Sequence, residues 1–256
     1  MDDRSQGAPE VARIVAELDE RGYCIIPSVI STAEADRARA VLERILAEEA
    51  TDATRRARSQ RVARIAVKHP IFLELMAHPL IVAIWRTYLD KDVICSTWTA
   101  NTTFPGYDRI GWHPDFPYQW LNQPWPADRI SGQTIWMLDD FTDRNGGTGL
   151  VPFSHRKGHR PPPGVASRWH PDAEILTGVR GSVLVMHGAN WHTARPNRSG
   201  AARSALLGMY TRPIYLTQED MPAQLTDLDN PSELVRQLMG ANRHRPGVVG
   251  TGQSGQ

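Results

Sequence analysis

The chain has very little cysteine. Cys24 and Cys95 are its only cysteines, and they stand at no metal-ligand spacing. Two isolated cysteines exclude a secreted scaffold held together by disulfides and agree better with a reducing cytosol. We therefore expect both to be small, buried apolar side chains.

The chain also lacks an excess of charge and a long apolar run. Its formal net charge is +1 and its isoelectric point is about 7.9, which argues against a surface that binds nucleic acid. Residues 1–4 are polar, and we find no stretch that approaches the roughly 18 apolar residues of a membrane span. These absences favour a cytoplasmic protein whose partner is a small molecule, with no membrane and no nucleic acid. They leave the oligomeric state open.

The first third of the chain has the pattern of a helical flank. Apolar residues recur at helical spacing before and after a short apolar run at residues 23–26, which predicts two helices separated by a strand. Ser31 and Glu34 form a capping box at the start of the second helix. Residues 51–60 are polar and lack an apolar period, which predicts a mobile loop. Two short helices are predicted after it.

From about residue 93 onward, β-branched and aromatic residues dominate. Strands are predicted at residues 93–104, 133–139, 149–152, 183–187 and 205–211. Helices first and short strands afterwards predict a mainly β protein with flanking helices, whose core is a double-stranded β-helix, the cupin-like jelly roll.

We predict a single domain over residues 1–256. Its helical flank covers about residues 9–92, and its jelly-roll core covers residues 93–215. A short helix is predicted at residues 232–239. The glycine-rich tail at residues 240–256 is expected to be disordered.

A histidine and an aspartate two residues apart are the first candidates for chemistry. His113 and Asp115 lie in the sequence GWHPD, just after a predicted strand and a Pro-Gly turn. On an extended strand, side chains two residues apart point to the same side. One more imidazole, for which we select His192, completes the two-histidine, one-carboxylate set that binds non-haem Fe(II) and leaves open positions on the metal.

Several segments resemble the phytanoyl-CoA dioxygenase family of Fe(II)/2-oxoglutarate-dependent oxygenases. The H-x-D motif and the segment GSVLVMHGANWHTARPNRS at residues 181–199, which leads through Arg203 into an apolar strand, carry the resemblance. The sequences GYCIIP at residues 22–27, LDDFTDRNGG at 138–147 and VPFSHR at 151–156 extend it.

This resemblance implies a dioxygenase that depends on Fe(II), 2-oxoglutarate and O2. Such an enzyme hydroxylates an unactivated C–H bond of a small molecule and releases succinate and CO2. The resemblance implies that His113, Asp115 and His192 are the catalytic residues and the metal ligands. Relatives that halogenate carry Gly or Ala at the carboxylate position, so Asp115 argues against halogenation.

His187 is an alternative to His192 as the distal ligand. In the family, an asparagine follows the distal histidine by five residues and an arginine follows it by eleven, and Asn197 and Arg203 fit this register from His192. From His187, the arginine position holds Arg198, but the asparagine position holds a histidine. We therefore prefer His192 and interpret His187 as a strand-end residue near the site.

Arg203 is the predicted anchor of the co-substrate. A chelated 2-oxoacid leaves its second carboxylate deep in an apolar barrel, where a guanidinium is the best-matched partner. Ala194 stands where the family often has a hydroxyl group, so other donors must contribute. The candidates are Thr99, Gln133 and Thr134, of which we select Thr99 and Gln133, and we place Trp136 among the residues that line the co-substrate site.

Other functions remain open at this stage. The same cofactors support desaturation, epimerisation or cyclisation, and the three ligands also suit a zinc hydrolase or a barrel that binds a metal or ligand without redox turnover. The aromatic residues at 116–125 could cover or grip a flat apolar substrate, or they could form a hydrophobic plug. They motivate our expectation of a secondary metabolite or an amino-acid-like substrate.

Overall fold

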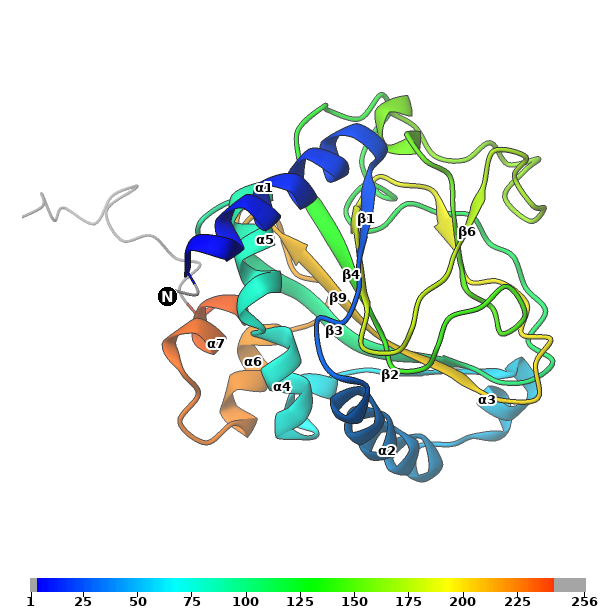
Figure 1. Cartoon of the computed structure of the whole chain (residues 1–256), viewed down its shortest axis with the longest axis horizontal. Coiled ribbons are helices and arrows are strands. Elements are labelled where there is room, and N and C mark those ends of the chain that lie inside the picture. Colours follow the sequence, from blue (N-terminus) through cyan, green and yellow to red (C-terminus); the bar gives the residue numbers. More distant parts are fainter. Residues whose placement is uncertain (1–3, 242–256) are drawn as a thin grey trace, which may run out of the picture.

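A six-stranded antiparallel sheet forms the centre of the computed structural model, which describes residues 4–241 (Figure 1). Its strands lie in the order β1-β7-β4-β9-β3-β2. Their bounds are Tyr23–Ile26 (β1), Ser59–Val62 (β2), Ile94–Thr103 (β3), Ser131–Met137 (β4), Val183–His187 (β7) and Arg203–Thr211 (β9). β1 and β7 have the predicted bounds, and the predicted ends of β3, β4 and β9 are wrong by one or two residues.

A smaller sheet of three short strands faces the large one. Its order is β6-β5-β8, with bounds Glu174–Leu176 (β6), Thr148–Leu150 (β5) and His192–Thr193 (β8). Apolar side chains from both sheets pack in one cluster, among them Leu150, Leu176 and Leu184. Two facing antiparallel sheets confirm the predicted jelly-roll core, although the sheets do not close into a barrel. The strands β6 and β8 were not predicted.

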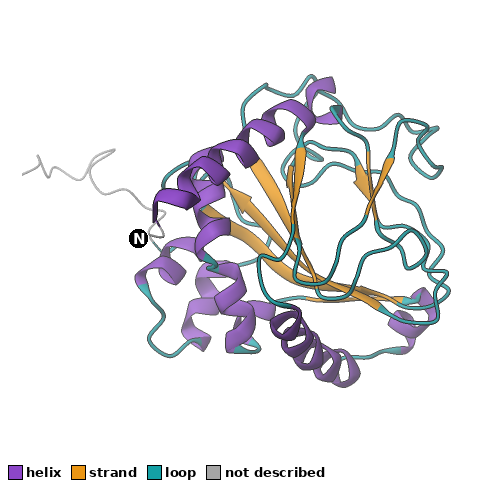
Figure 2. Cartoon of the chain, viewed as in Figure 1, coloured by secondary structure: helices purple, strands orange, loops and turns teal. Residues whose placement is uncertain are grey.

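Helices cover the face of the large sheet that is turned away from the small sheet (Figures 1 and 2). The helices that precede β3 in the sequence are α1 (Arg4–Arg21), α2 (Thr32–Glu48), α3 (Asp52–Ala57), α4 (Pro70–Met76) and α5 (Pro79–Tyr88). Two more, α6 (Met221–Gln224) and α7 (Glu233–Leu238), follow the last strand. Three short 3₁₀ turns are Ile65–Val67 (η1), Ser154–Lys157 (η2) and Leu225–Asp227 (η3).

The start of α2 confirms the predicted capping box. The Ser31 hydroxyl accepts a hydrogen bond from the Glu34 N–H (3.2 Å), and the Glu34 carboxylate accepts one from the Ser31 N–H (2.9 Å). Both N–H groups lie in the first turn, where no carbonyl of the helix can reach them. The local sequence therefore determines where α2 begins.

Side chains of the large sheet alternate between the helices and the small sheet. On β4, Thr134 and Trp136 face the helices, where Trp85 of α5 donates a hydrogen bond to the Thr134 hydroxyl (2.8 Å). The intervening Gln133 and Ile135 face the small sheet. One face of the sheet therefore builds the main core, and the other face is turned toward a cavity.

Gly132 makes room for this packing of Trp85 on the sheet. A Cβ atom at Gly132 would lie 2.1 Å from the ring of Trp85, so the fully buried indole would have to move. We expect Gly132→Ala to lower the free energy of unfolding by about 1–3 kcal/mol, the usual cost of overpacking a core. Urea denaturation measures this, with Gly164→Ala as the control because nothing lies within 4 Å of a Cβ there. Equal losses in both variants would contradict the packing argument.

The prediction of a mobile loop at residues 51–60 is wrong. Thr51 and Thr54 cap the short helix α3 through reciprocal hydrogen bonds between side chain and backbone. The next residues form β2, which pairs antiparallel with β3 at the edge of the large sheet. Because α3 carries exposed arginines, it lacks the apolar periodicity that predicts a helix. The strand β2 is too short to show its alternation clearly.

One stretch, Pro70–Tyr88, does reach the length and mean hydropathy (1.2) at which a helix could cross a membrane. By length and composition, the expectation that no stretch approaches a membrane span is therefore wrong. The stretch consists of α4 and α5, separated at residues 77–78, and 44% of it is buried inside the protein. Phe72, Ile84 and Trp85 from it are fully buried in the main core, which accounts for its apolar character.

Other predictions have mixed outcomes. Cys24 and Cys95 are free and buried, as expected. The predicted helix near the end is α7, capped by Ser232. The predicted disorder at residues 240–256 falls almost entirely outside the described residues. The division into a flank and a core remains a prediction, although β1 and β2 show that the flank contributes strands to the large sheet.

Candidate functional site

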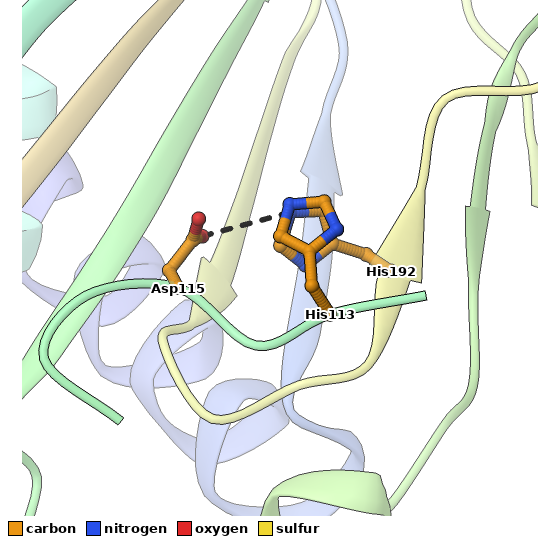
Figure 3. Close-up of side chains that lie close together, drawn as sticks. All are labelled: His113, Asp115 and His192. Atoms are coloured by element: carbon orange, nitrogen blue, oxygen red, sulfur yellow. Dashed lines mark ion pairs between the residues drawn. The ribbon is translucent and has the colours of Figure 1, made fainter. Parts of the chain in front are cut away.

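The three predicted metal ligands meet at one point between the two sheets (Figure 3). One ligand atom from each of His113, Asp115 and His192 can be chosen so that all lie within 4.8 Å of one another. The Nε2 atom of His192 is 3.7 Å from a carboxylate oxygen of Asp115, and the centroids of the two imidazoles are 4.4 Å apart. Residues far apart in the sequence therefore form one compact group of metal-binding side chains.

Backbone hydrogen bonds hold the two histidines side by side. The N–H of His113 donates to the carbonyl of His192, and the N–H of His192 donates to the carbonyl of His113, both at 3.1 Å. The N–H of Asp115 donates to the carbonyl of Gly188 (2.7 Å). The expectation that His113 and Asp115 lie on an extended strand is wrong, because this pairing is an isolated bridge. Their side chains nevertheless point to the same side, toward His192 (Figure 3).

A tryptophan precedes each of the two histidines and packs on the side of the segment that faces away from the site. Trp112 and Trp191 are buried and pack against Val151. Because neighbouring side chains in extended backbone point to opposite sides, burying both tryptophans turns both histidines toward the cavity. The apolar cluster behind the site thus positions the ligands in front of it.

A backbone carbonyl orients each imidazole through its Nδ1 atom. The Nδ1 atom of His113 lies 2.7 Å from the carbonyl of Gly111, and that of His192 lies 3.1 Å from the carbonyl of Asn190. A carbonyl only accepts hydrogen bonds, so each Nδ1 carries the proton. In a neutral ring, Nε2 is then the nitrogen with a free lone pair, which is the atom that binds a metal ion.

The ring of His113 is neutral near pH 7. Desolvation first, and the neighbouring His192 second, lower its pKa to about 4. An edge of His113 is nevertheless exposed at the mouth of the site. A neutral ring at physiological pH is ready to bind a cation without first losing a proton.

A cavity of about 90 Å³ begins at these ligands and extends between the sheets. Its walls come from both sheets and from the loop that carries the H-x-D motif. The residues that line it are Arg61, Asn101, His113, Asp115, Gln133, Ile135, Thr148, His192, Thr193, Ala194, Arg203 and Leu207. Of the predicted co-substrate residues, the cavity therefore includes Arg203 and Gln133.

Arg203 is a buried cation without a carboxylate partner. Its side chain is 3% exposed, donates to the carbonyl of Gly146 (2.8 Å) and lies over the ring of Phe141 (4.6 Å). Burial lowers the pKa of Arg203 to about 10, which keeps it charged at neutral pH. No carboxylate within the described residues forms an ion pair with it. Burying such a charge is costly, so an anionic ligand in this cavity would be strongly favoured.

Several buried polar atoms near the cavity have no hydrogen-bond partner. They include Nε of Arg203, Oδ2 of Asp115, Oε1 of Gln133 and Oγ1 of Thr99 and Thr103. Buried polar groups in folded proteins are nearly always paired. The Arg203 Nε–H and the two threonine hydroxyls can donate to oxygen atoms of a ligand, and the free Asp115 oxygen can bind a cation.

Thr99 and Trp136 differ in how they lie relative to the cavity. Thr99 pairs across the sheet with Leu207, which lines the cavity, but Thr99 is not itself among the lining residues. Trp136 lies on the opposite face of the sheet, fully buried in the main core, with its ring against His78. Trp136 is therefore a packing residue, and the expectation that it lines the co-substrate site is wrong.

His187 lies outside the metal group. Its Nδ1 accepts a hydrogen bond from the N–H of Ala189 (2.9 Å), and its ring packs against Tyr88, Tyr118 and His155. Burial lowers the pKa of His187 to about 3, so it is a neutral packing residue. This placement agrees with its interpretation as a strand-end residue near the site.

The aromatic stretch at residues 116–125 is mainly a hydrophobic plug. Tyr118 and Trp125 are buried in a small cluster with Ile130 and Ala189. Trp120 is 74% exposed, and Phe116 is half-buried. The stretch therefore supports the loop of the H-x-D motif more than it forms a binding surface.

Sequence reasoning missed Arg61, Asn101 and Thr148, which also line the cavity. The alternation of Gln60 and Val62 toward the core could have indicated that Arg61 faces the other way.

A larger cavity of about 670 Å³ lies beside α2 and includes none of the predicted site residues. Size alone therefore does not identify the functional site.

Comparisons with known proteins agree with this geometry. A sequence model of the family described as phytanoyl-CoA dioxygenase (PhyH) matches residues 18–205. An uncharacterized protein of Mycobacterium tuberculosis is 27% identical over 234 residues, which are 86% of this chain and 82% of that protein. Dioxygenase af480 of Aspergillus fumigatus is 25% identical over 239 residues, which are 84% of this chain and 73% of that protein.

A solved structure shares the fold. The epimerase SnoN, in complex with Fe3+, alpha ketoglutarate and nogalamycin RO, is 17% identical, with a TM-score of 0.64 over 80% of this chain and 84% of that one. This likeness concerns the fold alone. The match to the family, by contrast, spans most of the sequence and includes all three histidine and aspartate ligands, so the chain belongs to the phytanoyl-CoA dioxygenase (PhyH) family.

Proposed function

We propose that this protein is an Fe(II)- and 2-oxoglutarate-dependent dioxygenase that hydroxylates an unactivated C–H bond of a small molecule. One observation carries the proposal. A cavity has three metal-binding side chains at one end, and a buried arginine without a carboxylate partner also lines it. The SnoN structure, which holds Fe3+ and alpha ketoglutarate in the same fold, supports it.

Each residue has a distinct task in this proposal. His113, Asp115 and His192 hold the metal, and Arg203 binds the distal carboxylate of 2-oxoglutarate. Gln133 lines the cavity, and its side-chain N–H groups would donate a hydrogen bond to an oxygen atom of the same molecule. When bound, iron and 2-oxoglutarate together supply the power to oxidise a C–H bond, with succinate and CO2 as the co-products.

The walls of the cavity protect this chemistry from water. Ile135 and Leu207 line it from the large sheet, and Trp112 and Trp191 close the side behind the ligands. Apolar walls strengthen the attraction between Arg203 and a carboxylate, because the effective dielectric constant is lower than in water. They also exclude solvent from the reacting carbon.

A zinc hydrolase is less well supported. Among the described residues that line the cavity, Asp115 is the only carboxylate. As a metal ligand it cannot also serve as the general base that activates water. Arg203 would also have no task in such an enzyme. A barrel that only binds a ligand remains the rival that needs an experiment.

The visible absorption band of the Fe(II)–2-oxoglutarate chelate tests the proposal. We expect the band to form in the wild-type protein without oxygen only when both Fe(II) and 2-oxoglutarate are present. Admitting O2 should then produce succinate. A protein that shows no band and no succinate would refute the oxygenase assignment in favour of a binding protein.

Hydroxylation is the finer part of the proposal. The same site could support desaturation, epimerisation or cyclisation of a secondary metabolite or an amino-acid-like substrate. Mass spectrometry under ¹⁸O₂ separates these outcomes, because only hydroxylation adds one labelled oxygen atom to the product. A product without the label would assign one of the other reactions.

A further inference from the structure

Arg61 lies at the mouth of the cavity, on the edge strand β2. Gln60 and Val62 are buried toward the helices, so the alternation of the strand turns Arg61 to the opposite face. There it pairs across the sheet with Asn101, and both residues line the cavity together with His113 and His192. The two polar side chains thus form one corner of the mouth.

Arg61 has no partner within the described residues. It forms no ion pair and no side-chain hydrogen bond there, and it is exposed. Asn101 accepts a hydrogen bond from the Ser59 hydroxyl on its Oδ1 (3.5 Å), which leaves its amide N–H groups for a ligand. The corner therefore offers a cation and a neutral donor, both on strands whose positions are fixed by pairing.

When Fe(II) and 2-oxoglutarate are bound, the positive charge of Arg61 has no counter-charge among the residues that line the cavity. The positive charges of Fe(II) and Arg203 are offset by Asp115 and by the two carboxylates of 2-oxoglutarate. Asp115 is the only acidic residue among those that line the cavity, so nothing remains to neutralise Arg61. The residual charge at the mouth is positive, which favours a negatively charged substrate.

We propose that Arg61 and Asn101 bind an anionic group of the substrate, so that the molecule oxidised at this site carries a carboxylate or a phosphate. The inference rests on the proposed function and adds the class of substrate to it. In this arrangement Arg203 binds the co-substrate, and Arg61 binds the substrate at the mouth. The reacting carbon of the substrate then lies between Arg61 and the metal ligands.

Arg61 could instead protect the edge of the sheet. A charge on an edge strand hinders pairing with another chain, and that role would be satisfied by any charged residue. If Arg61 had only that role, the protein would bind small molecules of different charge equally well. The two roles therefore differ in ligand preference, which can be measured directly.

The test uses the full-length protein loaded with Ni(II) and 2-oxoglutarate, so that no turnover occurs. The probes are phenylacetate, phenyl phosphate and phenylacetamide, whose dissociation constants are measured by ligand-observed NMR. We expect at least one anionic probe to bind the wild type about 10-fold more tightly than the amide. We expect this preference to vanish in Arg61→Gln and to persist in part in Arg61→Lys.

Arg56→Gln is the matched control, because Arg56 is also exposed but lies on α3 outside the cavity. It should keep the preference of the wild type. A carboxylate preference would indicate an acid as substrate, and a phosphate preference would indicate a phosphate ester. Equal binding of the three probes by the wild type, including no detectable binding of any, would overturn the proposal, and so would an unchanged preference in Arg61→Gln.

The chelate band separates this inference from the proposed function. Arg61→Gln should form the band at the same 2-oxoglutarate concentration as the wild type. If the wild type forms no band, the oxygenase assignment itself fails. If Arg61→Gln needs much more 2-oxoglutarate, Arg61 serves the co-substrate and the assignment to the substrate is wrong.

Discussion

Replacing His192 with alanine is expected to weaken Fe(II) binding by more than about 100-fold, because even the loss of a partner that orients a metal ligand costs roughly 10- to 100-fold. The variant keeps only His113 and Asp115, which come from one short segment of the chain. Anaerobic equilibrium dialysis against Fe(II) measures the affinity. The chelate band with 2-oxoglutarate should also disappear, and with it the succinate formed after O2 is admitted.

His187→Ala is the matched control for this experiment. It removes the imidazole that the sequence offers as the alternative ligand, but the structure places that ring among Tyr88, Tyr118 and His155. We expect metal affinity like that of the wild type and a lower free energy of unfolding, because truncating a buried ring leaves a cavity. Loss of metal in His187→Ala with retention in His192→Ala would reverse the assignment.

Replacing Arg203 with methionine should raise the dissociation constant of 2-oxoglutarate by at least about 30-fold, since breaking a buried charge pair costs roughly 2–5 kcal/mol. Fe(II) affinity should stay unchanged, because Arg203 is not among the metal-binding group. Isothermal titration calorimetry with Ni(II) in place of Fe(II) measures co-substrate binding without turnover. The exposed Arg198, which fits the alternative register, provides the control as Arg198→Gln.

The stability of Arg203→Met tests whether the arginine serves the fold or the ligand. The guanidinium is buried without a carboxylate partner, and exchanging a buried charge for an apolar side chain of similar size is often neutral or stabilising. We therefore expect the free energy of unfolding of the ligand-free protein not to fall. A large fall in urea denaturation, with unchanged 2-oxoglutarate affinity, would make Arg203 a structural residue.

The sequence predicts the strands best where apolar runs end at clear turn residues. The runs that became β1 and β7 were predicted to the residue. In β4 every residue is buried, so the alternation of polar and apolar residues that reveals the inward face is absent. The pattern therefore does not show which face is turned toward the site, but Gln133 and Trp136 lie three residues apart on the predicted strand and must point to opposite faces, so only one of them could line it.

The sequence indicates which side chains form the candidate metal site, but not how they are held. His113 and His192 exchange two backbone hydrogen bonds, and nothing local in either segment indicates that pairing. The same limit explains why Arg61 was missed. Its position beside Asn101 depends on β2 joining the edge of the sheet, which is a contact between distant residues, whereas the local sequence shows only scattered arginines.

The bridge between His113 and His192 bears on how the protein acquires its metal in a cell. Backbone hydrogen bonds set the separation of the two rings, so folding and metal loading can be separate events. Such a rigid pocket of nitrogen and oxygen ligands also admits competing divalent ions, whose intrinsic affinities rise from Mn²⁺ to Cu²⁺. Which ion occupies it is then decided by the supply of metals in the cell more than by the protein.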